Sequence, residues 1–140
     1  IKNWQELGGQ DVPVQLVRIV SGLESGMLML FKELTVGKNG ELSNSAKTVL
    51  HPNDLGVLVA KNPGAITFMP LTQYNESYGT PVRINGTHPS KENVLNGSYY
   101  LTATYYLTLK NEEKSKINAF IDFIFSKKGK QVAALTHIPI

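Results

Sequence analysis

Residues 12–20 read VPVQLVRIV, a run that is rich in β-branched residues and apolar on both faces over much of its length. This composition is typical of a strand in a parallel sheet, because helices cover both faces of such a sheet. The chain then carries Leu28, Phe31 and Leu34 at helical spacing and reaches Gly37, where the helix is expected to end. A buried strand that leads into an amphipathic helix favours folds in which strands and helices alternate.

The middle of the chain continues this alternation in short segments. Strands are predicted over residues 45–50, 65–69, 82–85 and 99–110. A helix is predicted within residues 51–64, with Asn53 or Asp54 as its N-cap. A further short helix is expected to follow Ser90 as cap and to end at Gly97.

The C-terminal part carries the clearest amphipathic pattern of the chain. Five apolar residues recur at the spacing of one helix face, namely Ile117, Phe120, Ile121, Ile124 and Phe125. Ser126 is expected to cap a last helix that carries Val132, Ala133 and Leu135. Strands and helices alternate without repeats or a low-complexity linker, so the predicted fold class is α/β.

The composition narrows the function classes. The chain has 140 residues, a net charge of +3 and no cysteine, so neither a disulfide framework nor a cysteine nucleophile is available. Part of the positive charge is Lys127, Lys128 and Lys130, which we interpret as a solvated helix end and not as a nucleic-acid surface. The chain opens at Ile1 without a signal segment, and we expect a mature product or a piece of a longer protein.

Catalytic and metal sites are not predicted. The histidines, His51, His88 and His137, show no helical ligand spacing, so no metal site is expected. The stretch GLESG places its serine one position later than the nucleophile elbow does, so Ser25 is interpreted as a helix cap and not as a nucleophile. No glycine-rich dinucleotide or phosphate loop pattern occurs, and no cofactor is predicted. We therefore expect a protein that is not an enzyme.

The stretch RIVSGLESGM, between the first strand and its helix, has the groups of an anion site. The N-terminus of a helix exposes unpaired N–H groups, and glycine lets an oxyanion approach the backbone. Arg18 can donate two parallel hydrogen bonds, and Ser21 and Ser25 add hydroxyl donors beside Gly22 and Gly26. We predict an oxyanion site at these five residues. A capped helix beside a surface arginine is an equally open interpretation of the same residues.

Several segments, in order along nearly the whole chain, resemble the C-terminal half of the phosphate-binding proteins of ABC transporters. NWQELGGQDVPVQLVRIV is similar to the family's opening and to the strand that leads to its arginine. ESGM, with Phe31 four residues later, resembles Gly-Ser-Gly-Thr followed by phenylalanine. NPGAITFMPL, GTHPSKENVLNGSYYLTATYYL and FIDFIFSKKGKQVAALTHIPI are similar to the family's later segments, including its closing helix and terminal proline.

The resemblance implies one lobe of a two-lobed periplasmic-binding-protein-like fold, with a twisted mixed sheet and flanking helices. Residues 1–97 would form the second-lobe domain, and residues 98–140 the crossing strand and the helices that return toward a missing N-terminal lobe. The implied function is extracytoplasmic capture of phosphate or a similar small oxyanion for an ABC transporter permease or a membrane sensor, in the periplasm or outside the cell. Arg18, Ser25 and Gly26 would be the phosphate contacts.

The chain departs from the family pattern at two positions and in one spacing. Met27 replaces a threonine, and Glu24 replaces the first glycine of the motif. The distance from Arg18 to Ser25 is longer than in the family, so Ser21 and Gly22 compete for the same role. A module of this fold that has lost solute binding and serves assembly remains an alternative, and a serine hydrolase is a more distant one.

A homodimer is also predicted. The apolar stripe of the helix around Phe120 would be exposed without a first lobe, and exposed apolar side chains carry a free-energy cost. Two arrangements would remove that cost: residues 99–110 and the following helix could fold back on their own lobe, or they could exchange with a second copy as a domain swap. We favour the swapped dimer, because residues 99–109 are long enough to bridge two bodies.

Overall fold

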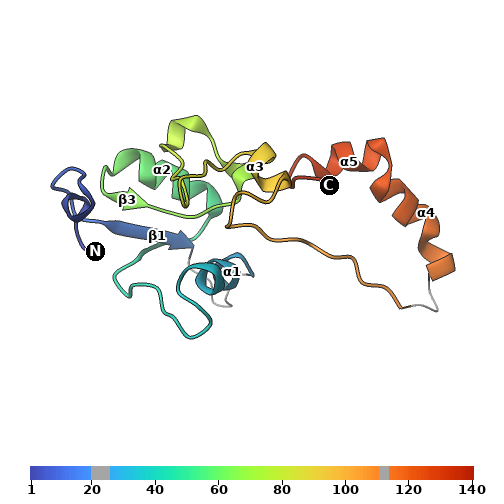
Figure 1. Cartoon of the computed structure of the whole chain (residues 1–140), viewed down its shortest axis with the longest axis horizontal. Coiled ribbons are helices and arrows are strands. Elements are labelled where there is room, and N and C mark those ends of the chain that lie inside the picture. Colours follow the sequence, from blue (N-terminus) through green and yellow to red (C-terminus); the bar gives the residue numbers. More distant parts are fainter. Residues whose placement is uncertain (20–25, 111–113) are drawn as a thin grey trace. The chain divides into compact units, whose positions relative to one another are not determined.

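The computed structural model describes residues 1–19, 26–110 and 114–140. The chain divides into two compact units, Ile1–Val82 and Arg83–Ile140. The first unit contains strands and helices, and the second contains helices and extended backbone (Figure 1). The α/β class is therefore confirmed, whereas the domain boundary that the sequence predicts after residue 97 stays a prediction.

In the described part of the first unit, residues 1–19 and 26–82, three strands alternate with two α-helices and three short 3-10 helices. The elements are η1 (Trp4–Leu7), β1 (Gln15–Ile19), α1 (Gly26–Thr35), β2 (Lys47–Val49), α2 (Pro52–Lys61), β3 (Ala65–Ile66), η2 (Leu71–Gln73) and η3 (Glu76–Tyr78). The strands form a parallel sheet in the order β2-β1-β3. The run at residues 12–20 thus supplies the central strand, as its apolar character on both faces predicts.

The core of the first unit lies on one face of this sheet. Val17 of β1, Val49 of β2 and Leu55 of α2 form a buried cluster, in which Val17 and Leu55 are each 1% exposed. Ala65 of β3 and Met69 pack against the same cluster. Because strand residues alternate between the two faces, α2 covers the face that Val17 and Ala65 share.

The central strand begins at Gln15, later than predicted, because a turn of backbone precedes it. Asn3 forms an isolated antiparallel bridge with Pro13, and the Val14 N–H donates to the carbonyl of Lys2 at 2.9 Å. Trp4 ties this segment to the end of the sheet, since its indole Nε1 donates to the Gly64 carbonyl at 3.0 Å. Val20, the predicted last residue of the strand, lies outside the described residues.

The predicted N-cap of α2 is wrong. The helix begins at Pro52, and His51, in extended conformation, is its N-cap and makes no side-chain cap hydrogen bond. Proline has no N–H and its φ is already helical, so it fits the first helical position, which places Asn53 and Asp54 inside the first turn. The strands predicted over residues 45–50 and 65–69 exist but shorten to β2 and β3.

The second unit carries α3 (Lys91–Leu95), α4 (Lys114–Phe125) and α5 (Lys127–Ala133). The predicted caps are confirmed: the side chain of Ser90 accepts from the N–H of Asn93, and that of Ser126 accepts from the N–H of Gly129. Leu135, predicted on the last helix, lies beyond its end and is 76% exposed.

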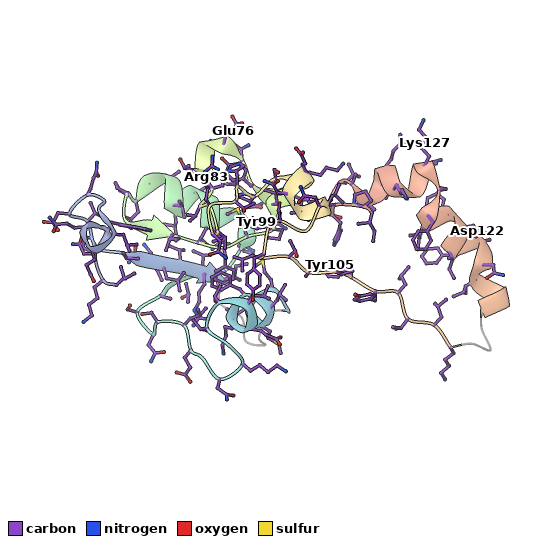
Figure 2. The ribbon with its side chains drawn as sticks, viewed as in Figure 1. Glu76, Arg83, Tyr99, Tyr105, Asp122 and Lys127 are labelled. Carbon is purple, nitrogen blue, oxygen red and sulfur yellow. The ribbon has the colours of Figure 1, made fainter. Side chains whose placement is uncertain are left out.

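Two predicted strands are wrong. Residues 82–85 were expected to be extended, but Ile84 and Thr87 pair across a tight turn in which Asn85 and Gly86 have φ of 50° and 79°. An Asn-Gly pair favours such a turn because both central residues need positive φ. Residues 99–110 pair with no strand of the described chain, and Tyr105 on this stretch is 80% exposed (Figure 2). β-Propensity favours extended backbone, but a strand also needs a neighbour that supplies its hydrogen bonds.

Candidate functional site

Arg18 is the first part of the predicted anion site that the structure describes. It is the penultimate residue of β1, in register with Thr48 of β2, and its side chain is half-buried. It lies next to Val17 in the strand, so it belongs to the sheet face opposite the Val17 cluster. In an open sheet of parallel strands, ligands bind at the carboxyl ends of the strands, which is where Arg18 stands.

The guanidinium of Arg18 has an unusual hydrogen-bond state. Its Nε atom is buried and has no hydrogen-bond partner among the described residues. A buried N–H without an acceptor is destabilising, and such groups are rare in folded proteins outside functional sites. This N–H group can therefore donate a hydrogen bond to an acceptor that is not among the described residues.

Gly26 is the second described part of the predicted site. It begins α1, and it is exposed. A Cβ atom added at Gly26 would meet no atom within 4 Å, so the space beside this backbone is open. The first N–H groups of a ten-residue helix such as α1 have no partner within the helix. None of the described residues therefore crowds the Cβ side of this backbone.

The other predicted site residues, Ser21, Gly22 and Ser25, lie outside the described residues, as does the predicted cap role of Ser25. The structure thus places Arg18 at the end of β1 and Gly26 at the start of α1, on either side of that segment. No described hydrogen bond joins the two residues.

Two contacts of the segment that follows β3 were not predicted from the sequence. The hydroxyl of Thr67, just after β3, donates to the carbonyl of Val17 at 2.8 Å. The rings of Phe31 on α1 and Phe68 are stacked, with centroids 4.1 Å apart and planes at 5°. The helical spacing of Leu28, Phe31 and Leu34 indicated that Phe31 packs against the rest of the protein. It did not indicate that Phe68 is the ring it contacts.

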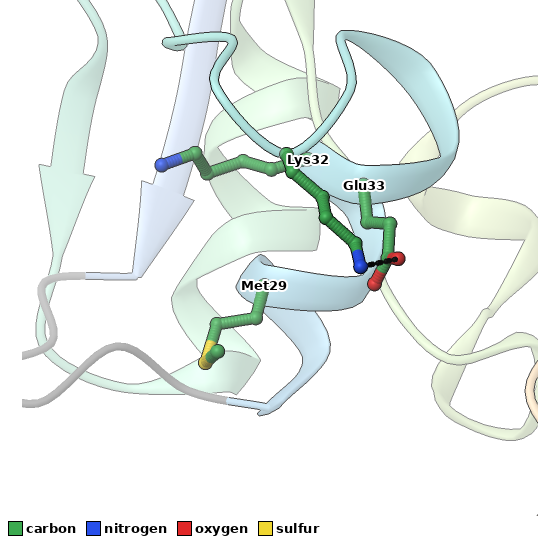
Figure 3. A pocket seen from close by; sticks show the side chains of 4 residues that line it. Met29, Lys32 and Glu33 are labelled. Carbon is green, nitrogen blue, oxygen red and sulfur yellow. Dashed lines mark ion pairs between the residues drawn. The ribbon is translucent and has the colours of Figure 1, made fainter.

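The hollows of the described surface do not coincide with the predicted site. One, of about 260 Å³, is lined by Met29, Lys32, Glu33 and Lys38 (Figure 3). It contains an ion pair between Lys38 and Glu33 at 3.8 Å, whose side chains are 82% and 54% exposed, so solvent screens it strongly. A second hollow lies along α3, beside Lys91 and Leu95. Neither hollow is lined by Arg18 or Gly26.

The described residues contain neither a cluster suited to a metal ion nor a helix suited to a membrane. No group of three or more His, Asp or Glu side chains in the described ranges could hold a metal ion. None of the helices within those ranges combines the length and the apolar character needed to cross a bilayer.

Comparisons with known proteins identify the family. A family model described as a PBP superfamily domain matches residues 1–128. The phosphate-binding protein PstS of Bacillus subtilis (strain 168) is 28% identical over 129 residues, which are 91% of this chain and 41% of that protein. The phosphate-binding protein PstS 2 of Streptococcus pneumoniae is 33% identical over 115 residues, which are 77% of this chain and 39% of that protein. The chain thus spans about two fifths of the length of these relatives.

Solved structures show the same fold. A protein of Clostridium perfringens with bound phosphate, assigned as the substrate-binding protein of a phosphate ABC transporter, superposes with a TM-score of 0.78 at 31% identity over 98% of this chain and 56% of that one. An ABC-type phosphate transport receptor from Vibrio cholerae superposes with a TM-score of 0.76 at 21% identity, which shows the fold alone. With a family match over residues 1–128 and this structural likeness, the chain belongs to the PBP superfamily.

Proposed function

We propose that this chain forms one wall of a phosphate site in a solute-binding protein that serves an ABC transporter. Support comes from relatives named for phosphate binding and from a solved structure with bound phosphate at 31% identity. These relatives are binding proteins by name, which favours capture over catalysis and favours neither of the alternative functions considered from the sequence. The structural observation that carries the proposal is the buried, unpartnered Nε of Arg18 at the carboxyl end of β1.

The proposed chemistry uses a fixed cation and backbone donors together. The guanidinium of Arg18 would donate two hydrogen bonds to phosphate oxygens, in the fork geometry that suits this anion. Backbone N–H groups at the start of α1, beginning with that of Gly26, would donate to another oxygen. Ser21, Gly22 and Ser25 are the proposed source of further donors from the connecting segment.

Two departures from the family pattern bear on which oxyanion is bound. Met27 supplies no hydroxyl where the family has a threonine, so this site would offer one donor fewer. If the carboxylate of Glu24 lies near the proposed anion, as its place in the motif implies, it would repel a dianion but could accept the proton of a singly charged phosphate. We therefore propose phosphate in its protonated form, or a similar small oxyanion, as the ligand.

We further propose that a second lobe completes the cleft. A two-lobed binding protein closes around its ligand, and a membrane partner reads the closed state. That partner would be the permease of an ABC transporter or a membrane sensor, and the protein would act in the periplasm or outside the cell. The proposal rests on the names of the relatives and on the chain's share of their length.

The exposed apolar side chains of α4 support the proposal that another surface covers this helix in the complete protein. Phe120 and Phe125 are 59% and 62% exposed in the described chain, whereas such rings are normally buried against a partner. We propose that the rest of a protein with the relatives' length covers this stripe. A homodimer formed by exchange of residues 99–110 and α4 is the competing arrangement, and light scattering at low and high protein concentration distinguishes the two.

Calorimetric titration with inorganic phosphate tests the proposed function. The complete product of the gene that encodes this chain should bind phosphate, and Arg18→Ala should weaken binding by roughly ten- to a hundredfold, because hydrogen bonds to charged groups contribute about 1.5–3 kcal/mol. Arg83→Ala is the matched control, since Arg83 is exposed and its Nη1 donates to the Gly86 carbonyl at 3.3 Å (Figure 2). Absence of phosphate binding in the complete product would contradict the proposal.

The 140-residue chain alone gives a second test. One wall offers three or four hydrogen bonds, which must offset an association cost of about 4 kcal/mol or more. We expect binding weaker than micromolar, abolished by Arg18→Ala and unchanged by Arg83→Ala. A micromolar or tighter dissociation constant for the isolated chain would show that a single wall is sufficient.

A further inference from the structure

The stacked rings of Phe31 and Phe68 join α1 to the segment that follows β3. The rings are nearly parallel, with centroids 4.1 Å apart, and both side chains are half-buried. Aromatic pairs more often meet edge-to-face or with an offset at larger separation, so this contact is a close one. Two flat faces at this separation restrict tilting of α1 about the contact.

The register of the sheet places Phe68 on the same face as Arg18. β1 and β3 pair with Gln15 opposite Ala65 and Leu16 opposite Ile66. The hydroxyl of Thr67 reaches the Val17 carbonyl at 2.8 Å, which extends this side-by-side arrangement by one residue. The next pair in the series is Arg18 and Phe68.

The packing of neighbouring residues agrees with this placement. Ala65 and Met69 both pack against the Val17 cluster, on the α2 face of the sheet. Phe68 precedes Met69, and side chains alternate along extended backbone, so Phe68 belongs to the opposite face. That is the face of Arg18, and the stack therefore fixes α1 to the Arg18 side of the sheet.

The stack is not needed simply to anchor the helix. Leu28, one turn earlier on α1, is buried with 6% exposure and provides an apolar anchor. The half-buried rings contribute a second point of attachment, which joins α1 to the segment that follows β3. A helix held at two points along its length has a fixed direction as well as a fixed position.

We propose that Phe31 and Phe68 are positioning residues of the oxyanion site. Through their stack, the first turn of α1 and the guanidinium of Arg18 converge on one anion. The inference rests on the proposed function, because it assigns a role within that same site. Thr67 supports it by holding the backbone that carries Phe68 against the carbonyl just before Arg18.

The test is phosphate titration of the complete gene product carrying Phe68→Leu, which removes the stack and keeps an apolar side chain. We expect affinity to fall by about three- to tenfold, whereas Phe68→Tyr, which keeps the ring, stays within about twofold of the parent protein. Phe31→Leu removes the stack from the α1 side and should give the same loss. Val57→Ala is the matched control, since that side chain is exposed on α2, the helix that covers the other face of the sheet.

A double-mutant cycle separates positioning from general stability. If the stack aligns α1 with Arg18, Arg18→Ala should cost a smaller factor in affinity in the Phe68→Leu background than in the parent protein. Urea midpoints establish that each variant is folded under the titration conditions. Folded Phe68→Leu and Phe31→Leu variants with the parent affinity would overturn the inference, as would additive effects in the cycle. A parent protein that does not bind phosphate, or an Arg18→Ala variant with the parent affinity, would instead contradict the proposed function.

Discussion

The two units, Ile1–Val82 and Arg83–Ile140, differ in how their elements are stabilised. The buried apolar side chains of the described chain, Val17, Leu28, Val49 and Leu55, all belong to the first unit. In the described part of the second unit the buried residue is a glycine, Gly129, while aromatic rings such as Phe120 and Tyr106 are largely exposed. The first unit has a core of its own, and the second shows helices with little core.

The two units therefore differ in what stabilises their helices and strands. In the first unit, β1 is paired on both sides and α2 buries Leu55 against it, so burial and sheet pairing act together. In the second unit, local signals define the helices, chiefly the caps Ser90 and Ser126. Local signals set where a helix begins and ends, but most helix stability in proteins comes from packing. The second unit is therefore the part expected to depend on a partner surface.

The largest expected effect tests the core of the first unit. Leu55→Ala should lower the free energy of unfolding by about 2–5 kcal/mol, because it removes a buried side chain and leaves a cavity. Phe120→Ala, at a position that is 59% exposed, should change it by less than about 0.5 kcal/mol in the 140-residue chain. Urea unfolding monitored by circular dichroism gives both values.

The same pair of variants sharpens the comparison in the complete gene product. If a second lobe covers α4 there, Phe120→Ala should become destabilising by about 3–5 kcal/mol, as for other buried rings. Equal and small effects of Phe120→Ala in both proteins would mean that α4 has no partner surface, and the dependence inferred for the second unit would be wrong.

The next prediction concerns the junction of α4 and α5 in the second unit. A Cβ atom at Gly129 would collide with the backbone carbonyl oxygens of Phe123 and Ile124, which a side-chain rearrangement cannot relieve. Gly129→Ala should therefore destabilise the α4–α5 pair by about 1–3 kcal/mol, despite the higher helix propensity of alanine. Hydrogen exchange of the α5 amides measures the loss. Lys128→Ala, at an exposed neighbouring position, is the control. Unchanged exchange in Gly129→Ala would show that this junction is not closely packed.

Local patterns predicted much of the fold. The β-branched run gave the central strand, helical spacing gave α1 and α4, and the serines at positions 90 and 126 gave two caps that the structure confirms. Two of the errors came from local signals that the prediction overlooked. A proline at the first helical position moved the start of α2, and the Asn85–Gly86 pair made a turn where a strand was expected.

The candidate site was predictable only in part. Arg18 and Gly26 stand at the ends of a strand and a helix, as the sequence order predicts. The stack of Phe31 on Phe68 depends on sheet register between segments that are far apart in sequence, and a pattern within one segment contains no such information. Ser21, Gly22 and Ser25 lie outside the described residues, and their roles stay predictions.

A smaller effect is expected from the cap of α5. The hydroxyl of Ser126 accepts from the Gly129 N–H at 3.1 Å and donates to the Phe123 carbonyl at 2.6 Å. Ser126→Ala removes both bonds and should cost about 1 kcal/mol. Ser126→Asp keeps an acceptor at the cap and should recover most of this loss. Helix content by circular dichroism, measured through a thermal transition, tests the order of the three proteins. If alanine and aspartate are equivalent, the second unit does not depend on this local signal.

The smallest effect concerns Glu6, at the start of the first unit, and it depends on pH. Backbone N–H groups of Lys2 and Asn3 donate to its carboxylate at 2.8 and 2.9 Å, and these hydrogen bonds lower the pKa of Glu6 below the ordinary 4.5. A lowered pKa means that the folded chain holds this proton less tightly than the unfolded chain does. The stabilisation is therefore complete above pH 4.5 and is lost as the pH falls through the folded-state pKa.

Glu6→Gln tests this dependence, because glutamine keeps an oxygen acceptor but cannot ionise. The parent chain should be more stable than Glu6→Gln at pH 7, and the difference in urea midpoint should shrink as the pH falls below 4.5. Glu41→Gln is the matched control at another exposed carboxylate. The shrinking difference should be confined to Glu6, since the capping box that Glu6 forms with Asn3 fixes the backbone ahead of β1. A difference that stays constant or widens on acidification would show that the carboxylate charge does not stabilise this cap, and that the order of the first unit near its N-terminus comes from the Trp4 contact and sheet pairing instead.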